Sequence, residues 1–145
     1  MSRDQIRVYI AAPFFNPDQL EIVERIESML QGKRIPYHSP REEGVLTKME
    51  DHTRAEKGAV IYDVNINGLE WCTHLIAVID DYDTGTVWEM GYAHAKGKGI
   101  FTYSSQQYGI NIMLEQSILS HCQTTKELSE SLDGTYRGKH NGELT

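Results

Sequence analysis

The sequence predicts a single α/β domain in which helices cover both faces of a parallel sheet. Three short apolar runs, at residues 6–12, 73–80 and 99–104, have the β-branched and aromatic content of buried parallel strands. Helical patterns separate these runs, which implies right-handed crossovers between parallel strands. A chain of 145 residues with 39% hydrophobic residues fits one core. We therefore expect one doubly wound parallel sheet with flanking helices.

The helices and a further strand are justified by their own patterns. Residues 17–31 carry apolar residues at spacings of three and four, which is typical of a helix that packs one face. The stretch RIPYHS predicts a weaker strand at residues 34–39. Residues 51–70 form a second helix candidate, although Gly58 and Gly68 weaken that interpretation. Two more helices are expected, at residues 86–96 and 111–119.

Composition and charge exclude several classes of partner. The net charge of −7 and pI near 5.3 argue against nucleic acid, because phosphate backbones are bound mainly by clustered Lys and Arg. No apolar run approaches the length of a membrane span, and the start of the chain lacks the apolar region of a signal peptide. Cys72 and Cys122 lie far apart in the sequence, without CxxC spacing or the cysteine density of a secreted scaffold. We therefore expect two reduced thiols in a cytoplasmic protein. The domain is assigned to residues 1–132, and residues 133–145 to a flexible polar tail.

The motifs of nucleotide cofactors and of metals are missing. The sequence contains no GxGxxG after the first strand and no GxxxxGK[ST], which are the glycine-rich cradles for phosphates. The six histidines show no HxxxH or HxH spacing, and no GxSxG elbow is present. We therefore expect neither a cofactor nor a metal, and place the ligand outside the carboxyl ends of the strands.

Two aromatic residues follow the first strand, in the segment AAPFFNPDQ. Phe14 and Phe15 are each expected in the core when taken alone. Adjacent side chains do not easily both point inward, so we expect one of the two to face the crevice and stack on a flat ligand such as a nucleobase.

The segment DTGTVWEMGYA follows the strand at residues 73–80 and carries two carboxylates around Gly85. Asp83 lies near the start of a helix, where it serves either as an N-cap or as an acid/base group. Glu89 lies one turn into that helix. A carboxylate there either compensates the helix dipole or, when partly desolvated in a crevice, acts as a nucleophile or acid/base group.

Two further segments carry polar candidates. In YDVNING, Asp63 and Asn65 are either hydrogen-bonding partners of a hydroxyl-bearing ligand or part of a solvated helix end. In GINIMLEQ, Asn111 is expected to cap a short helix that includes Met113.

The chain resembles the nucleoside 2-deoxyribosyltransferases. The segments VYIAAPFFNPDQ, DVNINGLEWCTHLIAVID, DTGTVWEMGYA and GINIML occur in the order and approximate spacing of that family, from Val8 to about Leu119. The resemblance implies a flavodoxin-like fold and transfer of 2-deoxyribose from a deoxynucleoside donor to a free nucleobase acceptor. It implies two displacements at the N-glycosidic bond, with retention at the anomeric carbon.

The same resemblance implies roles for individual residues. Glu89 matches the nucleophile that forms a covalent deoxyribosyl intermediate, Tyr9 the residue that orients it, and Asp83 the group that protonates the departing base. Asn65 falls where sugar hydroxyls are bound, and Asp63 is its neighbour in the same segment.

The resemblance also implies an oligomer and a base pocket. Asn111 and Met113 match a segment that reaches the active site of the adjacent subunit, which implies a homo-oligomer built from dimers. Arg41 and Glu42 are candidate contacts to the base. Residues 39–58 match the family loosely and should shape the base pocket, so the choice between purine and pyrimidine bases stays open.

Two rival functions remain from the sequence. A nucleoside 5'-monophosphate N-glycosidase shares the Glu-bearing helix start, but the segment PFFNPD offers aromatic rings and an acid where a phosphate site is needed. A non-catalytic nucleoside-binding module would lack the nucleophile, whereas Glu89, Asp83 and Tyr9 are all present. The sequence therefore favours the transferase.

Overall fold

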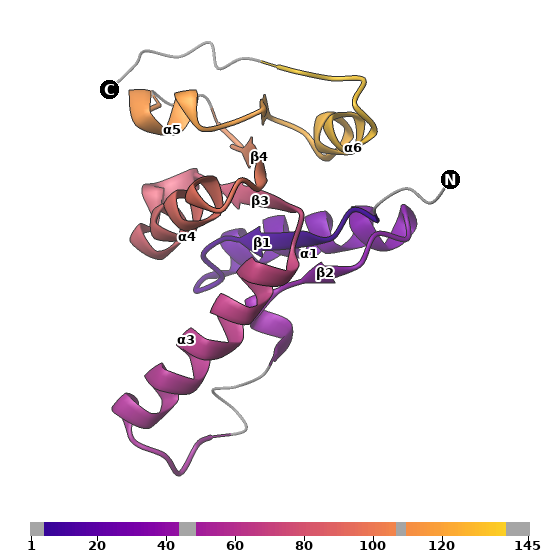
Figure 1. The fold of residues 1–145 in the computed structure, drawn as a ribbon. Helices are drawn as coiled ribbons and strands as arrows, with labels where there is room; N and C mark the ends of the chain where they lie inside the picture. The colour runs from indigo at the N-terminus through magenta and orange to yellow at the C-terminus, as the bar shows by residue number, and fades with distance from the viewer. Residues whose placement is uncertain (1–4, 44–48, 107–109, 139–145) are drawn as a thin grey trace.

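The computed structural model describes residues 5–43, 49–106 and 110–138 of the chain. In these residues one five-stranded parallel sheet has the order β2-β1-β3-β4-β5. The strands are β1 (Val8–Ala11), β2 (Tyr37–His38), β3 (His74–Val78), β4 (Gly99–Tyr103) and β5 (Ser120–Cys122). Helices lie on both sides of the sheet, so the predicted doubly wound α/β fold is confirmed (Figure 1).

Helices connect successive strands and begin at polar capping residues. They are α1 (Pro17–Gly32), α3 (Arg54–Trp71), α4 (Thr84–Ala95), α5 (Ile112–Gln116) and α6 (Thr125–Asp133), with short 3-10 turns η1 (Pro40–Glu43) and η2 (Asp80–Tyr82). In the described part of the chain, the side chain before each of these α-helices accepts a hydrogen bond from a backbone N–H two or three residues further on, which fixes where the helix begins. The capping residues are Asn16, Thr53, Asp83, Asn111 and Thr124.

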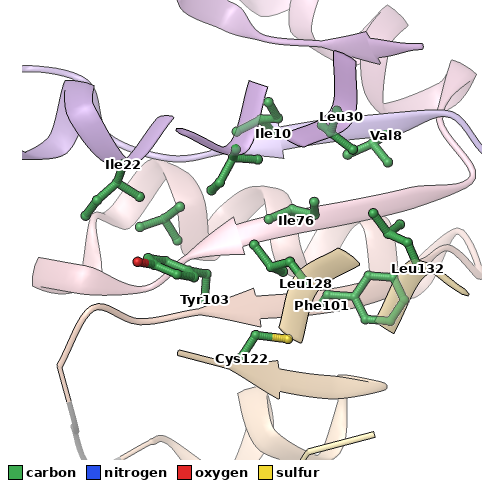
Figure 2. Packing of buried hydrophobic residues seen from close by; sticks show 12 residues of the cluster. Val8, Ile10, Ile22, Leu30, Ile76, Phe101, Tyr103, Cys122, Leu128 and Leu132 are labelled. Atoms are coloured by element: carbon green, nitrogen blue, oxygen red, sulfur yellow. The ribbon is translucent and has the colours of Figure 1, made fainter. Parts of the chain in front are cut away.

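One half of the core lies between the sheet and helices α1 and α6. Alternate residues of β1 point to opposite faces, and Val8 and Ile10 are the ones on this side. Helix α1 contributes Ile22, Ile26 and Leu30, which lie one turn apart and are all buried. Figure 2 shows side chains from four strands gathered with these residues and with the leucines of α6.

The other half of the core lies under helices α3 and α4. Tyr9 and Ala11 of β1 are buried there, against Leu69 of α3 and Met90 and Ala93 of α4. Since β1 contributes to both cores, its carboxyl end lies at the centre of the fold. Tyr9 is therefore enclosed on all sides and has no exposed surface.

Helix α3 packs on the sheet only near its carboxyl end. Gly68 and Leu69 are its buried residues, whereas its first half extends away from the sheet (Figure 1). Gly68 is required by close packing, because a Cβ there would lie 2.8 Å from Cγ of His38. No helix in the three described ranges is long and apolar enough to cross a membrane.

Strand β5 and helix α6 were not predicted from the sequence. Strand β5 is made of Ser120, His121 and Cys122, which are buried because polar partners satisfy them. Ser120 Oγ lies 2.9 Å from Ser131 Oγ of α6, and His121 Nδ1 lies 2.8 Å from the hydroxyl of Thr102.

The first residues after α6 pack beside β5. His121 N–H donates to the carbonyl of Gly138 at 2.9 Å, and Gly138 N–H donates to Ser120 Oγ at 3.1 Å. The rest of the expected tail, residues 139–145, lies outside the described residues.

The strand order creates a crevice between β1 and β3. The chain leaves β1 toward β2 on one side, and the later strands are added on the other side, so the loops after β1 and β3 diverge. In open α/β sheets ligands bind at this switch point, outside the carboxyl ends of the strands.

Candidate active site

A cavity of about 730 Å³ opens at the switch point, a volume suited to a small organic ligand. Its walls come from four places: the loop after β1, the turn η1 after β2, one face of α3 and the first turns of α4. The lining residues used below are Phe14, Phe15, Arg41, Tyr62, Asn65, Asp83, Gly85, Trp88 and Glu89. Six of the predicted site residues, together with Gly85, therefore meet in one cavity, although they come from four segments of the chain.

Glu89 lines the cavity and is held from below by Tyr9. The phenol Oη of Tyr9 donates a hydrogen bond to Glu89 Oε2. Among the described residues no hydrogen bond reaches the other oxygen, Oε1. The arrangement leaves one carboxylate oxygen for a ligand and fixes the other to a buried residue of β1.

The environment of Glu89 raises its pKa to about 7. Burial is the main cause, because desolvation disfavours the charged carboxylate. The hydrogen bond from Tyr9 acts in the opposite direction, and the nearby charge of Asp83 raises the pKa further. The pKa of the Tyr9 phenol is also raised, by its own burial first and by Glu89 second, so it stays a hydrogen-bond donor. A carboxylate with such a perturbed pKa in a cavity is a candidate catalytic group.

Asp83 lines the cavity and caps α4 at the same time. Its Oδ2 accepts hydrogen bonds from Thr86 N–H at 3.0 Å and from the Thr86 hydroxyl at 3.2 Å. Gly85 allows this position, because a Cβ there would lie 3.2 Å from Asp83 Oδ2, a tight contact. Because the cap uses Oδ2, the same side chain can present Oδ1 to a ligand in the cavity.

Asn65 reaches the cavity from α3 and is oriented by His38. His38 Nε2 lies 3.2 Å from Asn65 Oδ1, and since an amide oxygen only accepts, Nε2 is the donor. The His38 ring also stacks on the Tyr9 ring, with centroids 4.9 Å apart and planes 14° apart. This orientation turns the amide N–H donors of Asn65 away from His38. Asp63, in contrast, is exposed and is not among the described residues that line the cavity.

Aromatic rings line two sides of the cavity. Phe14 and Phe15 stack on each other, with centroids 4.9 Å apart, and both line it. Phe15 is 73% exposed, so it has a face available for a ligand. The second pair, Tyr62 and Trp88, makes an edge contact at 6.1 Å.

Sequence reasoning did not select Tyr62 and Trp88, although a signal was available. Tyr62 lies three residues before Asn65 and therefore on the same helical face, and Trp88 directly precedes Glu89.

Arg41 lines the cavity, whereas Glu42 does not. The guanidinium of Arg41 is bound by Glu27, a residue that sequence reasoning also missed. Hydrogen bonds from Arg41 to Glu27 raise the pKa of the arginine further, so it remains charged. Glu42 instead accepts a hydrogen bond from the Tyr37 hydroxyl at 3.1 Å.

Asn111 and Met113 lie outside this chain's own cavity. Asn111 caps α5, and its Oδ1 accepts a hydrogen bond from Met113 N–H at 2.8 Å, as the sequence predicts. The side chain of Met113 is 73% exposed. The structure therefore does not bring these two residues to Glu89 within one subunit.

The described residues add no metal cluster to this set. Within residues 5–43, 49–106 and 110–138, no three His, Cys, Asp or Glu side chains are grouped closely enough to hold a metal ion.

Comparisons with known proteins agree with this geometry. A family model described as nucleoside 2-deoxyribosyltransferase matches residues 8–124. The solved structure of a 2-deoxyribosyltransferase from the psychrotolerant bacterium Bacillus psychrosaccharolyticus is similar, with a TM-score of 0.80 and 25% identity over 92% of this chain and 98% of that one. A conserved protein from Enterococcus faecalis V583 shares the fold, with a TM-score of 0.59 and 19% identity over 97% of this chain and 91% of that one.

A comparison with curated proteins found no matching sequence. The family match covers most of the chain, including both carboxylates of the cavity and the buried tyrosine. The chain is therefore an enzyme of the nucleoside 2-deoxyribosyltransferase family, a group of pentosyltransferases.

Proposed function

We propose that the enzyme transfers 2-deoxyribose from a 2'-deoxynucleoside to a free nucleobase through a covalent ester on Glu89. The observation that carries this proposal is the Glu89 carboxylate, hydrogen-bonded through Oε2 to the buried Tyr9 and raised in pKa in a ligand-sized cavity. A nucleophile needs an oxygen that is both accessible and held in place. The Tyr9 hydrogen bond to Oε2 holds the Glu89 carboxylate in place, and it leaves Oε1 accessible.

In the first displacement, Glu89 Oε1 attacks the anomeric carbon C1' and the N-glycosidic bond breaks. The bonding electrons go to the ring nitrogen of the base. Asp83, which starts the reaction in its protonated form, gives its proton to the base as it departs. The position of Asp83 at the cavity wall, as the N-cap of the helix that carries Glu89, supports this role. Desolvation favours the reaction, because the charged carboxylate becomes a neutral ester.

In the second displacement, a nitrogen of the incoming base attacks C1' and the Glu89 carboxylate leaves. Asp83, now ionised, accepts the proton that the incoming base loses. The two steps balance, since one base replaces another and Glu89 and Asp83 return to their starting forms. Two inversions give net retention at C1'. The proposed reaction uses protein side chains only and needs no cofactor.

The aromatic and amide side chains supply binding. Phe14 and Phe15 on one side and Trp88 on the other present ring faces suited to stacking on a base. Asn65, oriented by His38, offers amide N–H donors to a sugar hydroxyl. The exposure of Asp63 supports at most a peripheral role for that residue.

The proposal includes a homo-oligomer built from dimers, in which Asn111 and Met113 complete the site of the neighbouring subunit. Two exposed apolar surfaces support it. Ile112 and Met113 on α5 are exposed, and so are Val60 and Tyr62 on the projecting half of α3. Large apolar side chains in such positions are typical of subunit contacts. A cytoplasmic location is part of the same proposal and is compatible with the free thiols of Cys72 and Cys122.

A base-exchange assay tests the proposal. Deoxythymidine is mixed with either adenine or hypoxanthine, and the products are separated by liquid chromatography. We expect thymine and the new purine deoxynucleoside in equal amounts, and no turnover with Glu89→Ala. Release of thymine and free sugar without a new nucleoside would identify a hydrolase instead. Turnover by Glu89→Ala at the wild-type rate would remove Glu89 from the mechanism.

A further inference from the structure

A buried ion pair forms part of the cavity wall and has no role in the chemistry described above. Glu27 of α1 is only 3% exposed and accepts three hydrogen bonds. Ser39 Oγ donates to its Oε2 at 2.6 Å, Arg41 Nε donates to Oε2 at 3.0 Å, and Arg41 Nη2 donates to Oε1. Arg41 also lines the cavity that contains Glu89.

This geometry fixes the plane of the guanidinium. A bidentate arginine–carboxylate pair holds both groups in one orientation, and a buried carboxylate is costly to leave without its partner. Ser39, two residues before Arg41, ties the same carboxylate to the backbone that precedes η1. Arg41 is therefore a rigid part of the wall. Arg25 differs, because it is exposed and its ion pair with Glu21 on α1 is long, at 3.9 Å.

Glu27 binds one edge of the Arg41 guanidinium and leaves the N–H donors of another edge available to a ligand. Its two oxygens bind the edge formed by Nε and Nη2, so the end formed by Nη1 and the second N–H of Nη2 still has donors to offer. Among the described residues no hydrogen bond reaches Nη1. Glu42 Oε1 lies 3.9 Å from Nη2, which is beyond hydrogen-bond distance. The remaining donors are a parallel pair of N–H groups on a side chain of the cavity wall.

The charge balance indicates which ligand atoms this pair suits. Glu27 neutralises Arg41, and the carboxylates of Asp83 and Glu89 line the same cavity, so a phosphate gains little there. A neutral group with two adjacent acceptors fits better, because arginine only donates. The O6 and N7 atoms of guanine or hypoxanthine form such an edge, whereas adenine places an amino donor at the same position.

We propose that Arg41, held in position by Glu27, recognises the O6 and N7 edge of a 6-oxopurine and makes the enzyme prefer guanine and hypoxanthine over adenine. This inference rests on the proposed function, since it assumes that the cavity holds the base. Arg41 is then a specificity-determining residue, and Glu27 is a positioning residue that acts through it.

Equilibrium binding of free bases tests the inference without depending on turnover. Hypoxanthine and purine are the matched ligands, because purine has the same rings without O6, and both are titrated by calorimetry. The variants are Arg41→Met, Glu27→Gln and the double variant, with Arg25→Gln as the control on the surface of α1. The double variant removes both charges, so it guards against unfolding caused by an unpaired Glu27.

We expect the wild type and Arg25→Gln to bind hypoxanthine roughly tenfold or more tightly than purine, with adenine weaker than hypoxanthine. The ratio of the purine to the hypoxanthine dissociation constant should approach one in Arg41→Met and in the double variant. Glu27→Gln keeps the guanidinium but loosens it, so its ratio should fall between these limits. A conserved ratio in the double variant, or no preference in the wild type, would overturn the role of Arg41. An unchanged ratio in Glu27→Gln would overturn the positioning role.

The exchange assay separates this inference from the proposed function. If the wild type exchanges no base with either deoxythymidine or deoxyinosine as the donor, the transferase mechanism fails, and the binding ratios still decide whether Arg41 selects 6-oxopurines. If exchange occurs but the double variant keeps its preference for hypoxanthine as acceptor, only the Arg41 inference fails.

Discussion

The activity of the enzyme should rise with pH through about 7, because the nucleophile must be the ionised form of Glu89. Glu89 titrates with a pKa of about 7, so about a tenth of it is charged at pH 6 and about nine tenths at pH 8. We therefore expect the ionisation of Glu89 to raise kcat/KM for base exchange about tenfold between pH 5 and 6, and this contribution to be complete above pH 8. Initial rates at low donor concentration, measured in buffers of constant ionic strength, give this profile.

The substitution Tyr9→Phe tests the cause of the titration. The Tyr9 hydrogen bond lowers the pKa of Glu89, so its loss should move the midpoint of the profile to higher pH. The wild-type profile would refute the assignment if its midpoint lay near 4.5, the ordinary value for a glutamate. An unshifted midpoint in Tyr9→Phe would refute the contribution of the hydrogen bond.

The same pKa predicts a stability effect of Glu89→Gln. The folded-state pKa of about 7 exceeds the unfolded value of 4.5, so the folded protein holds the extra proton between these limits and the wild type loses stability as pH rises through them. The full shift corresponds to roughly 3 kcal/mol at pH 8. Urea unfolding should show Glu89→Gln more stable than the wild type by up to that amount at pH 8, with the pH-dependent part of the difference shrinking as the pH falls from 7 to 4.5 and absent below 4.5. A difference that does not depend on pH would contradict the desolvation of Glu89.

Three further substitutions separate the roles of other residues. Asp83→Asn keeps an N-cap for α4 but removes the acid, so kcat should fall by about 10² to 10⁴ while the free energy of unfolding changes by only a few tenths of a kcal/mol. A free energy of unfolding lowered by several kcal/mol would instead make capping the main role of Asp83. Gly68→Ala places a Cβ 2.8 Å from His38 Cγ, so we expect about 1–3 kcal/mol of destabilisation. Because His38 orients Asn65, the KM for the donor should also rise. An unchanged free energy of unfolding would show that the His38 ring moves away without cost. Met113→Arg should reduce the oligomer to smaller species in light scattering and lower kcat/KM, while retention of both would remove α5 from the subunit contact.

The sequence predicts the centre of the fold better than its edge. Strands β1, β3 and β4 are buried on both faces, so their runs are apolar enough to be recognised. Helix α4 begins at Thr84, two residues before the expected start, because Asp83 caps it. Strand β5 is an edge strand of Ser120, His121 and Cys122, whose burial depends on partners in α6 and β4 that no local pattern indicates.

In the candidate site, too, the sequence predicts some residues and misses others. Glu89, Asp83 and Tyr9 belong to motifs that mark the ends of strands, and the parallel sheet brings such ends to one edge. The pairs that surround them join distant segments: Glu27 with Arg41, and His38 with Asn65. Nothing in the spacing of these residues indicates that they meet, because their contacts are fixed by the packing of α1 and α3 around β2.

The covalent intermediate can be observed directly by mass spectrometry. The enzyme is mixed with a deoxynucleoside in the absence of an acceptor base, quenched in acid and digested with a protease. We predict one added deoxyribosyl group on the peptide that contains Glu89, lost on addition of a free base and missing in Glu89→Gln. Base exchange without any adduct, or an adduct on a peptide that lacks Glu89, would contradict a double displacement through this residue.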